Sequence, residues 1–309
     1  MKCLVSGATG FIGRELCRQL DASAMSYIGL SRKGGVLPNG RASVVIDLGD
    51  QSVQQSLLDD IDVVFHLAGI AHQAAQPAMY EAVNHQATVE LARAAVMAGV
   101  KTFIFLSSVK AMGAPANPGV RTEGDCTVPR DAYGRSKLQA ELDLQAAYAN
   151  SEMSVIILRP ALVYGVGAAG NLDLLARAVR LGMPGPPLLG GRSMIALEDI
   201  VGLLMILAHS APKGVHTWIV CEDHCYTAGE ISDLMRVALG KKPVPRWLPL
   251  TFWRLGCAVR DRMAGAEKGS TFGKIFGTEL YCADALRLAV DWRPQVAFAD
   301  SVRRIMVAQ

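Results

Sequence analysis

Short apolar runs alternate with amphipathic stretches along the first half of the chain. The apolar runs lie at 2–7, 26–30, 43–47, 62–69, 101–108 and 154–160. They are nearly continuous in Val, Ile, Leu and Phe, which is typical of strands that a parallel sheet buries on both faces. Helical patterns separate most of them, at 11–20, 51–58, 78–98 and 131–149. This alternation predicts an α/β fold with a doubly wound parallel sheet.

The rhythm changes after Pro160, where glycine and proline become frequent. A chain of 309 residues is long enough for a large domain and a smaller one. We therefore expect one domain over 1–165 and a smaller C-terminal domain over 166–309. A later apolar run predicts that the chain returns to the first domain around 192–220.

Charge and hydropathy argue against two classes of partner. The net charge is only +3 and no run of Lys or Arg forms a basic stripe, so we expect no nucleic-acid partner. The start of the chain lacks the features of a signal peptide, and the most apolar later stretch, 200–208, is about half as long as a membrane span. We expect no integral membrane segment. The amphipathic stretch 248–263 could touch a membrane surface, but we expect it to cover the smaller domain.

The seven cysteines are irregularly spaced and include no CxxC pair. Reduced thiols in a cytoplasmic protein fit this pattern best. Cys221 and Cys225 flank His224 in a way that resembles a metal site. No second ligand pair occurs at zinc spacing, so we predict no metal.

Gly7, Gly10 and Gly13 follow the first predicted strand and lead into the first predicted helix. In this position, glycines allow a tight turn, a close approach to a pyrophosphate and close packing of helix on strand. The N-terminus of the helix then offers free N–H groups to the phosphates. The sequence therefore predicts a Rossmann-type fold in which 1–165 binds a dinucleotide.

The end of the second predicted strand bears on the identity of that dinucleotide. An acid usually meets the ribose 2′-hydroxyl there. This chain has Ser31 and Arg32 instead, which would accept a 2′-phosphate, so NADP(H) is preferred and NAD(H) stays possible. A solvated basic loop that tolerates either cofactor is the alternative. Asp47 could accept a hydrogen bond from the adenine amino group, and Ala68 and Gly69 would let backbone lie close to the cofactor.

Five motifs occur in order at suitable intervals. They are GATGFIG at 7–13, HLAG at 66–69, SSVKAMG at 107–113, YGRSK at 133–137 and LRPALVYG at 158–165. Together they resemble the extended short-chain dehydrogenase/reductase family, also called the NAD-dependent epimerase/dehydratase family. The resemblance spans roughly the first two-thirds of the chain. It implies that the smaller domain over 166–309 binds substrate.

The resemblance assigns Tyr133 as the acid/base. Lys137 lies one helical turn later, on the same face, and its ammonium group should lower the phenol pKa from about 10. The resemblance also lets Lys137 hold the nicotinamide ribose. Ser108 matches the hydroxyl that bonds the reacting oxygen. Tyr164 has no lysine four residues later and is not expected to act. His66 is expected to pack, and His72 could face the substrate.

Residues next to these motifs are assigned as further contacts to the cofactor or the substrate. The candidate cofactor contacts also include Phe11, Ile12, Leu48, Leu67, Asn84, Ser107 and Pro160. The candidate substrate contacts are Ser108, Lys110, Tyr133, Asn171 and Arg192, with Lys274 as a weaker one. Asn171 and Arg192 match family residues near a nucleotide diphosphate. The alternative is a loop-capping asparagine and a surface arginine.

The two residues after Ser108 narrow the reaction. Dehydratases of the family carry an Asp-Glu pair there, whereas this chain has Val109 and Lys110. The motifs also resemble bacterial UDP-sugar enzymes of lipopolysaccharide and O-antigen synthesis. We expect reduction of a UDP-4-keto-6-deoxy-hexosamine at C4. The alternatives are a UDP-hexose 4-epimerase with tightly held NAD, an NADP-dependent reductase of a non-sugar carbonyl, and a non-catalytic NADP sensor. By analogy, the helices at 78–98 and 131–149 would form a homodimer.

Overall fold

Seven strands form one sheet in the computed structural model, which describes residues 1–71, 75–168, 171–243, 246, 248–263 and 270–308. The strands are β1 (Lys2–Ser6), β2 (Ser26–Ser31), β3 (Val44–Val45), β4 (Val63–His66), β5 (Thr102–Leu106), β7 (Ser154–Pro160) and β10 (Val215–Val220). Their order is β10-β7-β5-β4-β1-β2-β3, and every neighbouring pair is parallel. The predicted doubly wound, Rossmann-type sheet is confirmed.

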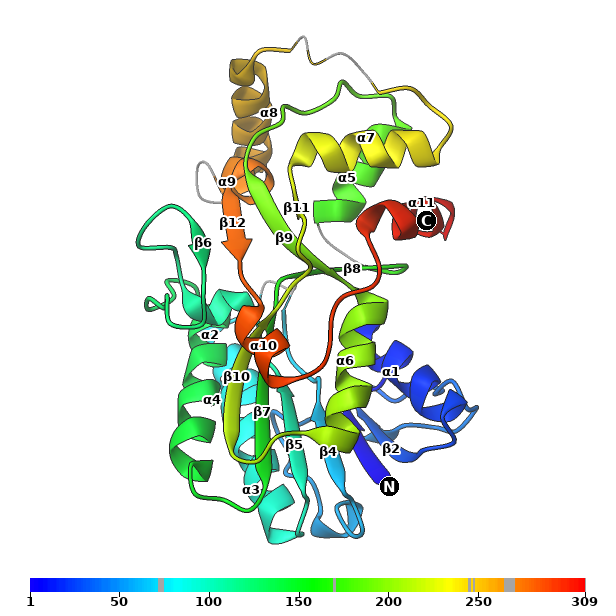
Figure 1. The fold of residues 1–309 in the computed structure, drawn as a ribbon, viewed down its shortest axis with the longest axis vertical. Helices are drawn as coiled ribbons and strands as arrows, with labels where there is room; N and C mark the ends of the chain where they lie inside the picture. The colour runs from blue at the N-terminus through cyan, green and yellow to red at the C-terminus, as the bar shows by residue number, and fades with distance from the viewer. Residues whose placement is uncertain (72–74, 169–170, 244–245, 247, 264–269, 309) are drawn as a thin grey trace. The chain divides into compact units, whose positions relative to one another are not determined.

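Helices cover both faces of this sheet. On one face α1 (Phe11–Ala22) packs with α6 (Leu197–Ser210), and on the other α3 (Ala87–Met97) packs with α4 (Ala132–Tyr148) (Figure 1). The other elements of this part are η1 (Gln55–Leu57), α2 (Pro77–Tyr80), the π-helix η2 (Glu81–Gln86), η3 (Val109–Met112), β6 (Val120–Arg121) and α10 (Asp284–Ala289). The carboxyl ends of β1 and β4 lie side by side where the winding reverses, which is where such sheets bind ligands.

The prediction of a helix over 51–58 is wrong. The structure has only the short 3₁₀-helix η1 there. Val53 and Leu58 are both buried. In a continuous α-helix, side chains five residues apart point about 140° away from each other. A loop with a single 3₁₀ turn lets both side chains reach the core.

The chain forms two compact units. The first comprises Met1–Ala161, Leu197–Val220 and Cys282–Arg293, and the second comprises Leu162–Ala196, Cys221–Tyr281 and Pro294–Gln309. The chain first passes from the first unit to the second after Ala161, slightly before the domain boundary expected at 165. The chain also returns to the first unit a second time, at Cys282–Arg293, which the sequence did not lead us to expect.

Strands of the second unit also form a sheet. Strand β9 (Gly191–Ala196) pairs in parallel with β8 (Leu162–Tyr164) and β12 (Thr278–Tyr281), and antiparallel with β11 (Cys225–Tyr226). Its helices are α5 (Asn171–Arg180), α7 (Ala228–Ala238), α8 (Leu250–Met263), α9 (Ser270–Phe276) and α11 (Phe298–Ala308). Tyr164 packs edge-on against Phe298 in this core, and its hydroxyl donates to the Val296 carbonyl at 2.9 Å. Tyr164 therefore supports the fold. Within the described residues, none of the helices has the length and apolarity to cross a bilayer.

Candidate active site

Three glycines shape the turn between β1 and α1. Gly7 has φ +73°, and a Cβ there would lie 2.8 Å from the amide nitrogen of Ala68. A Cβ on Gly13 would lie 2.1 Å from the Gly7 carbonyl oxygen, so only glycine allows α1 to pack this closely. Gly10 is the exposed N-cap of α1, and no side chain caps the helix. Its free N–H groups fit the pyrophosphate of a dinucleotide. Phe11 and Ile12, which begin α1, are half-buried.

The end of β2 joins a buried hydroxyl to an exposed cation. Ser31 is buried, and its Oγ is 2.7 Å from the Oγ of Ser43. Arg32, the next residue, is exposed. Asp47 and Leu48 are half-buried just beyond β3, and Asp47 accepts a hydrogen bond from the Gly49 amide at 3.1 Å. These groups fit the ribose and adenine end of a dinucleotide.

His66 holds the end of β4 to its surroundings. Its Nδ1 is 2.7 Å from the Ser6 hydroxyl and its Nε2 is 2.8 Å from the Thr88 hydroxyl. Burial, reinforced by the charge of Lys137, lowers the pKa of His66 to about 3. The imidazole is therefore neutral and structural, as its sequence context predicts. The same Ser6 hydroxyl accepts a hydrogen bond from the Ala68 amide, which fixes the segment Leu67–Gly69.

Asn84 ties that segment to α4. It is fully buried in the π-helix η2, a helix type that often marks functional sites. Its side chain accepts from the Ile70 amide at 2.8 Å and donates to the Ile70 carbonyl at 3.0 Å. It also donates to the Ser136 hydroxyl at 3.2 Å. Asn84 thus orders the predicted acid/base helix together with the loop after β4.

Tyr133 lies close enough to Ser108 for the serine hydroxyl to act on the phenol pKa. Tyr133 lies in the first turn of α4, whose N-cap Asp131 accepts from the Gly134 amide at 2.8 Å. Ser108 follows β5 and also accepts from the Lys110 amide at 3.2 Å, while the Lys110 side chain is exposed. The two elements carrying the predicted hydroxyls therefore meet as the sequence requires.

Lys137 lies one turn after Tyr133 and is buried. Its Nζ donates to the Leu106 carbonyl at 2.9 Å and lies 4.5 Å from the centre of the Phe105 ring. A Cβ on Gly69 would come within 3.3 Å of the same nitrogen. The lysine thus faces the segment after β4, where a cofactor fits.

The expected direction of the Tyr133 pKa shift is wrong in this structure. Burial raises the pKa of Tyr133 to about 12, and the hydrogen bond from Ser108 only partly offsets it. Burial also lowers the pKa of Lys137 to about 7, with Glu141 acting in the opposite direction. Burial thus favours the neutral form of both groups. The sequence shows the spacing of the pair but not how deeply the fold buries it.

A buried ion pair supports this site, and the sequence analysis missed it. Arg159, just before Pro160 in β7, donates from Nη2 to Glu141 Oε2 at 2.6 Å and from Nε to both carboxylate oxygens. Glu141 also accepts a short hydrogen bond from the Ser107 hydroxyl. Glu141 follows Lys137 by one turn, so the spacing Tyr133–Lys137–Glu141 was a signal available in the sequence.

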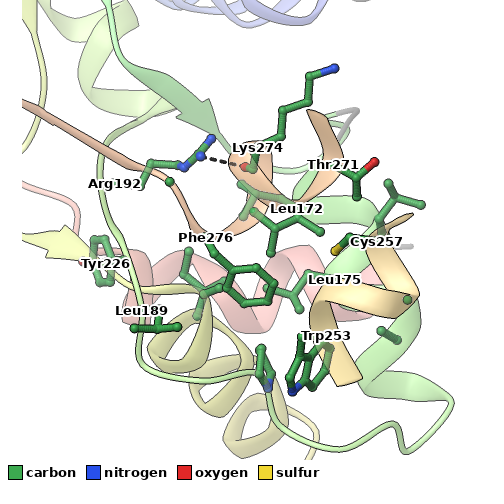
Figure 2. A pocket seen from close by; sticks show the side chains of 18 of the residues that line it. Leu172, Leu175, Leu189, Arg192, Tyr226, Trp253, Cys257, Thr271, Lys274 and Phe276 are labelled. Carbon is green, nitrogen blue, oxygen red and sulfur yellow. Dashed lines mark hydrogen bonds between the residues drawn. The ribbon is translucent and has the colours of Figure 1, made fainter. Parts of the chain in front are cut away.

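Arg192 lies in the second unit, on β9. Its Nη2 donates to the Lys274 carbonyl at 2.7 Å, and its Nη1 is 3.9 Å from Glu279. Arg192 and Lys274 border a cavity of about 400 Å³ whose lining is mostly apolar (Figure 2). Asn171 is the first residue of α5, but its side chain lies outside what the structure describes, and so does His72.

Comparisons with known proteins agree with the geometry. The profile described as "NAD dependent epimerase/dehydratase family" matches residues 3–218. A UDP-glucose 4-epimerase of Vibrio cholerae is 32% identical over 281 residues, which is 85% of each chain. A dTDP-6-deoxy-L-talose 4-dehydrogenase (NAD(P)(+)) of Kitasatospora kifunensis is 32% identical over 69% of this chain and 72% of its own length.

Solved structures share the fold over the whole chain. The structure of MoeE5 in complex with UDP-glucuronic acid and NAD has a TM-score of 0.79 at 23% identity and covers 100% of this chain and 98% of its own. The UDP-glucose 4-epimerase of Thermotoga maritima, solved with UDP-glucose, has a TM-score of 0.77 at 20% identity and covers 100% and 98%. The family resemblance found in the motifs is confirmed: the chain belongs to the NAD-dependent epimerase/dehydratase family and is an NAD(P)-dependent enzyme of the extended short-chain dehydrogenase/reductase type.

Proposed function

We propose that the chain reduces a UDP-4-keto-6-deoxy-hexosamine at C4, as a nucleotide-sugar 4-ketoreductase. The observation that carries this is that Ser108, Tyr133 and buried Lys137 come together in the same unit as the glycine turn. These groups provide a proton donor, an oxygen-binding hydroxyl and a dinucleotide site together.

The proposed roles follow from the state of each group. When bound, the nicotinamide supplies the hydride. Tyr133 gives its proton to the carbonyl oxygen, and its raised pKa keeps the phenol protonated at neutral pH, the form that reduction needs. Ser108 binds the same oxygen. Lys137 holds the ribose hydroxyls and steadies the charge left on Tyr133.

The proposed cofactor preference is NADP(H), with NAD(H) also accepted. Arg32 is exposed at the end of β2, where it can meet a 2′-phosphate. Structurally similar proteins have been solved with NAD. Arg32→Asp should shift the ratio of kcat/KM values toward NADH, because an acid repels the 2′-phosphate. An unchanged ratio would remove the argument for NADP(H).

The proposed substrate is a UDP-sugar. Arg192 supports this, because a guanidinium suits a diphosphate and this one borders a cavity in the second unit. Asn171 and Lys274 are proposed as further contacts. Relatives and structural neighbours named for UDP-sugars agree with this class. We place the reaction in the synthesis of lipopolysaccharide and O-antigen precursors.

A second candidate function is a UDP-hexose 4-epimerase that keeps its NAD bound. The relative from Vibrio cholerae favours it, whereas the 4-dehydrogenase from Kitasatospora kifunensis favours net oxidation or reduction at C4. Arg32, exposed at the end of β2 where it suits an exchangeable NADP(H), favours the reductase.

Two assays separate the candidates. Incubation with UDP-4-keto-6-deoxy-HexNAc and NADPH should consume NADPH and give one 4-hydroxy product by NMR. Incubation with UDP-glucose or UDP-GlcNAc and no added cofactor should leave the sugar unchanged. If the second assay gives the C4 epimer while the first consumes no NADPH, the chain is an epimerase.

We also propose a cytoplasmic homodimer. All seven cysteines are free thiols, which suits a reducing compartment. Helices α3 and α4 expose Met97 and Leu142, at 70% and 47% of their surface, as a partner helix pair would require. Ultracentrifugation should give twice the monomer mass.

A further inference from the structure

Helix α8 carries an exposed apolar stripe that the proposed function does not use. Phe252, Leu255, Val259 and Met263 are 49%, 66%, 51% and 84% exposed. Their spacing of three and four residues places all four on one side of the helix, within about 80° of arc. Isolated apolar residues at a surface are ordinary, but a stripe along a whole helix marks an interaction site.

The opposite side of α8 anchors the helix in the second unit. Cys257 and Asp261 are buried there, and Asp261 accepts a hydrogen bond from the Thr271 amide at 3.0 Å. Trp253 packs against Phe276 with ring centres 6.0 Å apart. The apolar stripe therefore lies on the side of α8 opposite the packed one. A partner can bind the stripe without any rotation of α8.

Arginines flank the stripe. Arg260 and Arg262 are exposed on its two sides, and Arg254 is exposed further round the helix, over the Phe272 ring. The single acid of α8, Asp261, is buried, so the exposed part of this helix carries only positive charge. The segment 241–263 contains six Lys or Arg and one Asp, a net charge of +5 against +3 for the entire chain.

This combination points to one kind of partner. A helix with apolar side chains on one face and arginines beside them suits the boundary between lipid headgroups and acyl chains. Each Lys or Arg near the surface adds to the attraction toward anionic lipid. Phe252 also belongs to the lining of the cavity described above.

We infer that α8 docks the protein reversibly onto an anionic lipid surface, with Phe252, Leu255, Val259 and Met263 entering the interface and the arginines meeting phosphate groups. A second copy of the chain fits less well, because two like segments of net charge +5 would repel each other. The expectation that 248–263 only covers the smaller domain accounts for one side of α8 and leaves the other unexplained.

Vesicle flotation of the full chain tests the inference. At low salt the protein should float with vesicles of equal parts phosphatidylcholine and phosphatidylglycerol, and not with phosphatidylcholine alone. Leu255→Glu with Val259→Glu should weaken this binding by at least about tenfold, since it places charges in the apolar layer. Arg262→Glu should weaken it by about fivefold or more, and added salt should do the same.

Leu288→Glu is the matched control, because Leu288 is an apolar residue on α10 that is 89% exposed. It should float like the wild type. The inference is overturned if the wild type does not float, or if the control loses binding as much as the α8 variants do. It is also overturned if the α8 variants abolish self-association in ultracentrifugation, which would show that a second copy covers the stripe. Unchanged thermal unfolding of each variant shows that the fold is intact.

Discussion

At the residue scale, burial shifts the pKa values of Tyr133 and Lys137 toward their neutral forms. The pKa of the phenol is raised and that of the ammonium is lowered. The sequence indicates which two residues meet, since their spacing fixes it. It does not indicate the sign of the pKa shift, which depends on how the surrounding loops exclude water.

Tyr133→Phe removes the proposed proton donor and keeps the ring. We expect kcat to fall by about 10²- to 10⁴-fold. Cofactor affinity, measured by fluorescence titration, should stay nearly unchanged. Tyr80→Phe is the matched control, because the Tyr80 ring centre lies 6.2 Å from that of Tyr133 and its loss of a hydroxyl should spare most of the rate. A Tyr133→Phe enzyme of normal kcat would contradict the acid/base role.

Glu141→Gln tests the buried support of the site. It leaves Arg159 without its carboxylate in a region where both side chains are almost fully buried. We expect the free energy of unfolding to fall by about 3–5 kcal/mol, as when one partner of a buried pair is removed. Denaturation in urea measures this.

Glu90→Gln breaks an exposed pair with Arg93 and serves as its control. The denaturation midpoint of that variant should barely move. If both substitutions lowered the free energy of unfolding equally, the buried pair would contribute no more to stability than the exposed one.

At the scale of elements, α4 and the π-helix η2 are joined by His85. Its Nδ1 lies 2.5 Å from Glu81 Oε1, and its Nε2 lies 2.6 Å from Asp143 Oδ2. Burial acts to lower the pKa of His85, but hydrogen bonds to Asp143 and Glu81 outweigh it and raise the pKa above 6.5. The imidazole therefore links the two helices, and these contacts favour its charged form.

This pKa shift predicts a pH-dependent stability. A group whose pKa rises on folding stabilises fully below its unfolded pKa of about 6.5, and this stabilisation is lost as the pH rises through the folded value. The Tm difference between wild type and His85→Gln should be largest in mildly acidic buffer and should shrink above neutral pH. Glu81→Gln removes one group that raises the His85 pKa, so the loss of this stabilisation should begin at a lower pH. A Tm difference that is constant with pH would exclude the linkage.

The elements also show what an isolated sequence can reveal. Continuous apolar runs predicted the sheet strands because buried parallel strands need no polar side. The π-helix at Glu81–Gln86 gave no such signal, and the hydrogen bonds that its Asn84 makes to Ile70 and Ser136 join segments far apart in the sequence. The spacing of Glu141 after Lys137 was visible in the sequence, but its partner Arg159 comes from another element and meets it only in the fold.

At the scale of the whole molecule, the first unit is built from three separate stretches of chain. The stretch Leu197–Val220 supplies α6 and the edge strand β10, which pairs with β7 along its full length from Val215 to Val220. Loop-rich composition after Pro160 indicated where the chain leaves this unit. The short return at Cys282–Arg293 has no sequence signature, because it brings only the six-residue helix α10 and a few core residues.

Residues 1–165 by themselves should therefore not fold as a cooperative unit. Without 197–220 the sheet loses the buried side chains of Leu203, Leu204, Leu207, Trp218 and Ile219. Each fully buried large apolar side chain contributes about 1.5–3 kcal/mol, and a domain is stable by only about 5–15 kcal/mol. The lost burial is thus comparable with the whole stability. The expected result for this fragment is a broad thermal transition and no measurable cofactor binding.

A matched chain separates this effect from simple shortening. Joining 1–161 to 197–220 and 282–293 through flexible linkers restores every segment of the first unit and omits the second. It should regain a sharp unfolding transition and bind NADP(H), since the glycine turn, Asn84 and Lys137 all belong to that unit. A sharp transition in the 1–165 fragment would show that β7 tolerates being an edge strand and that β10 only extends the sheet.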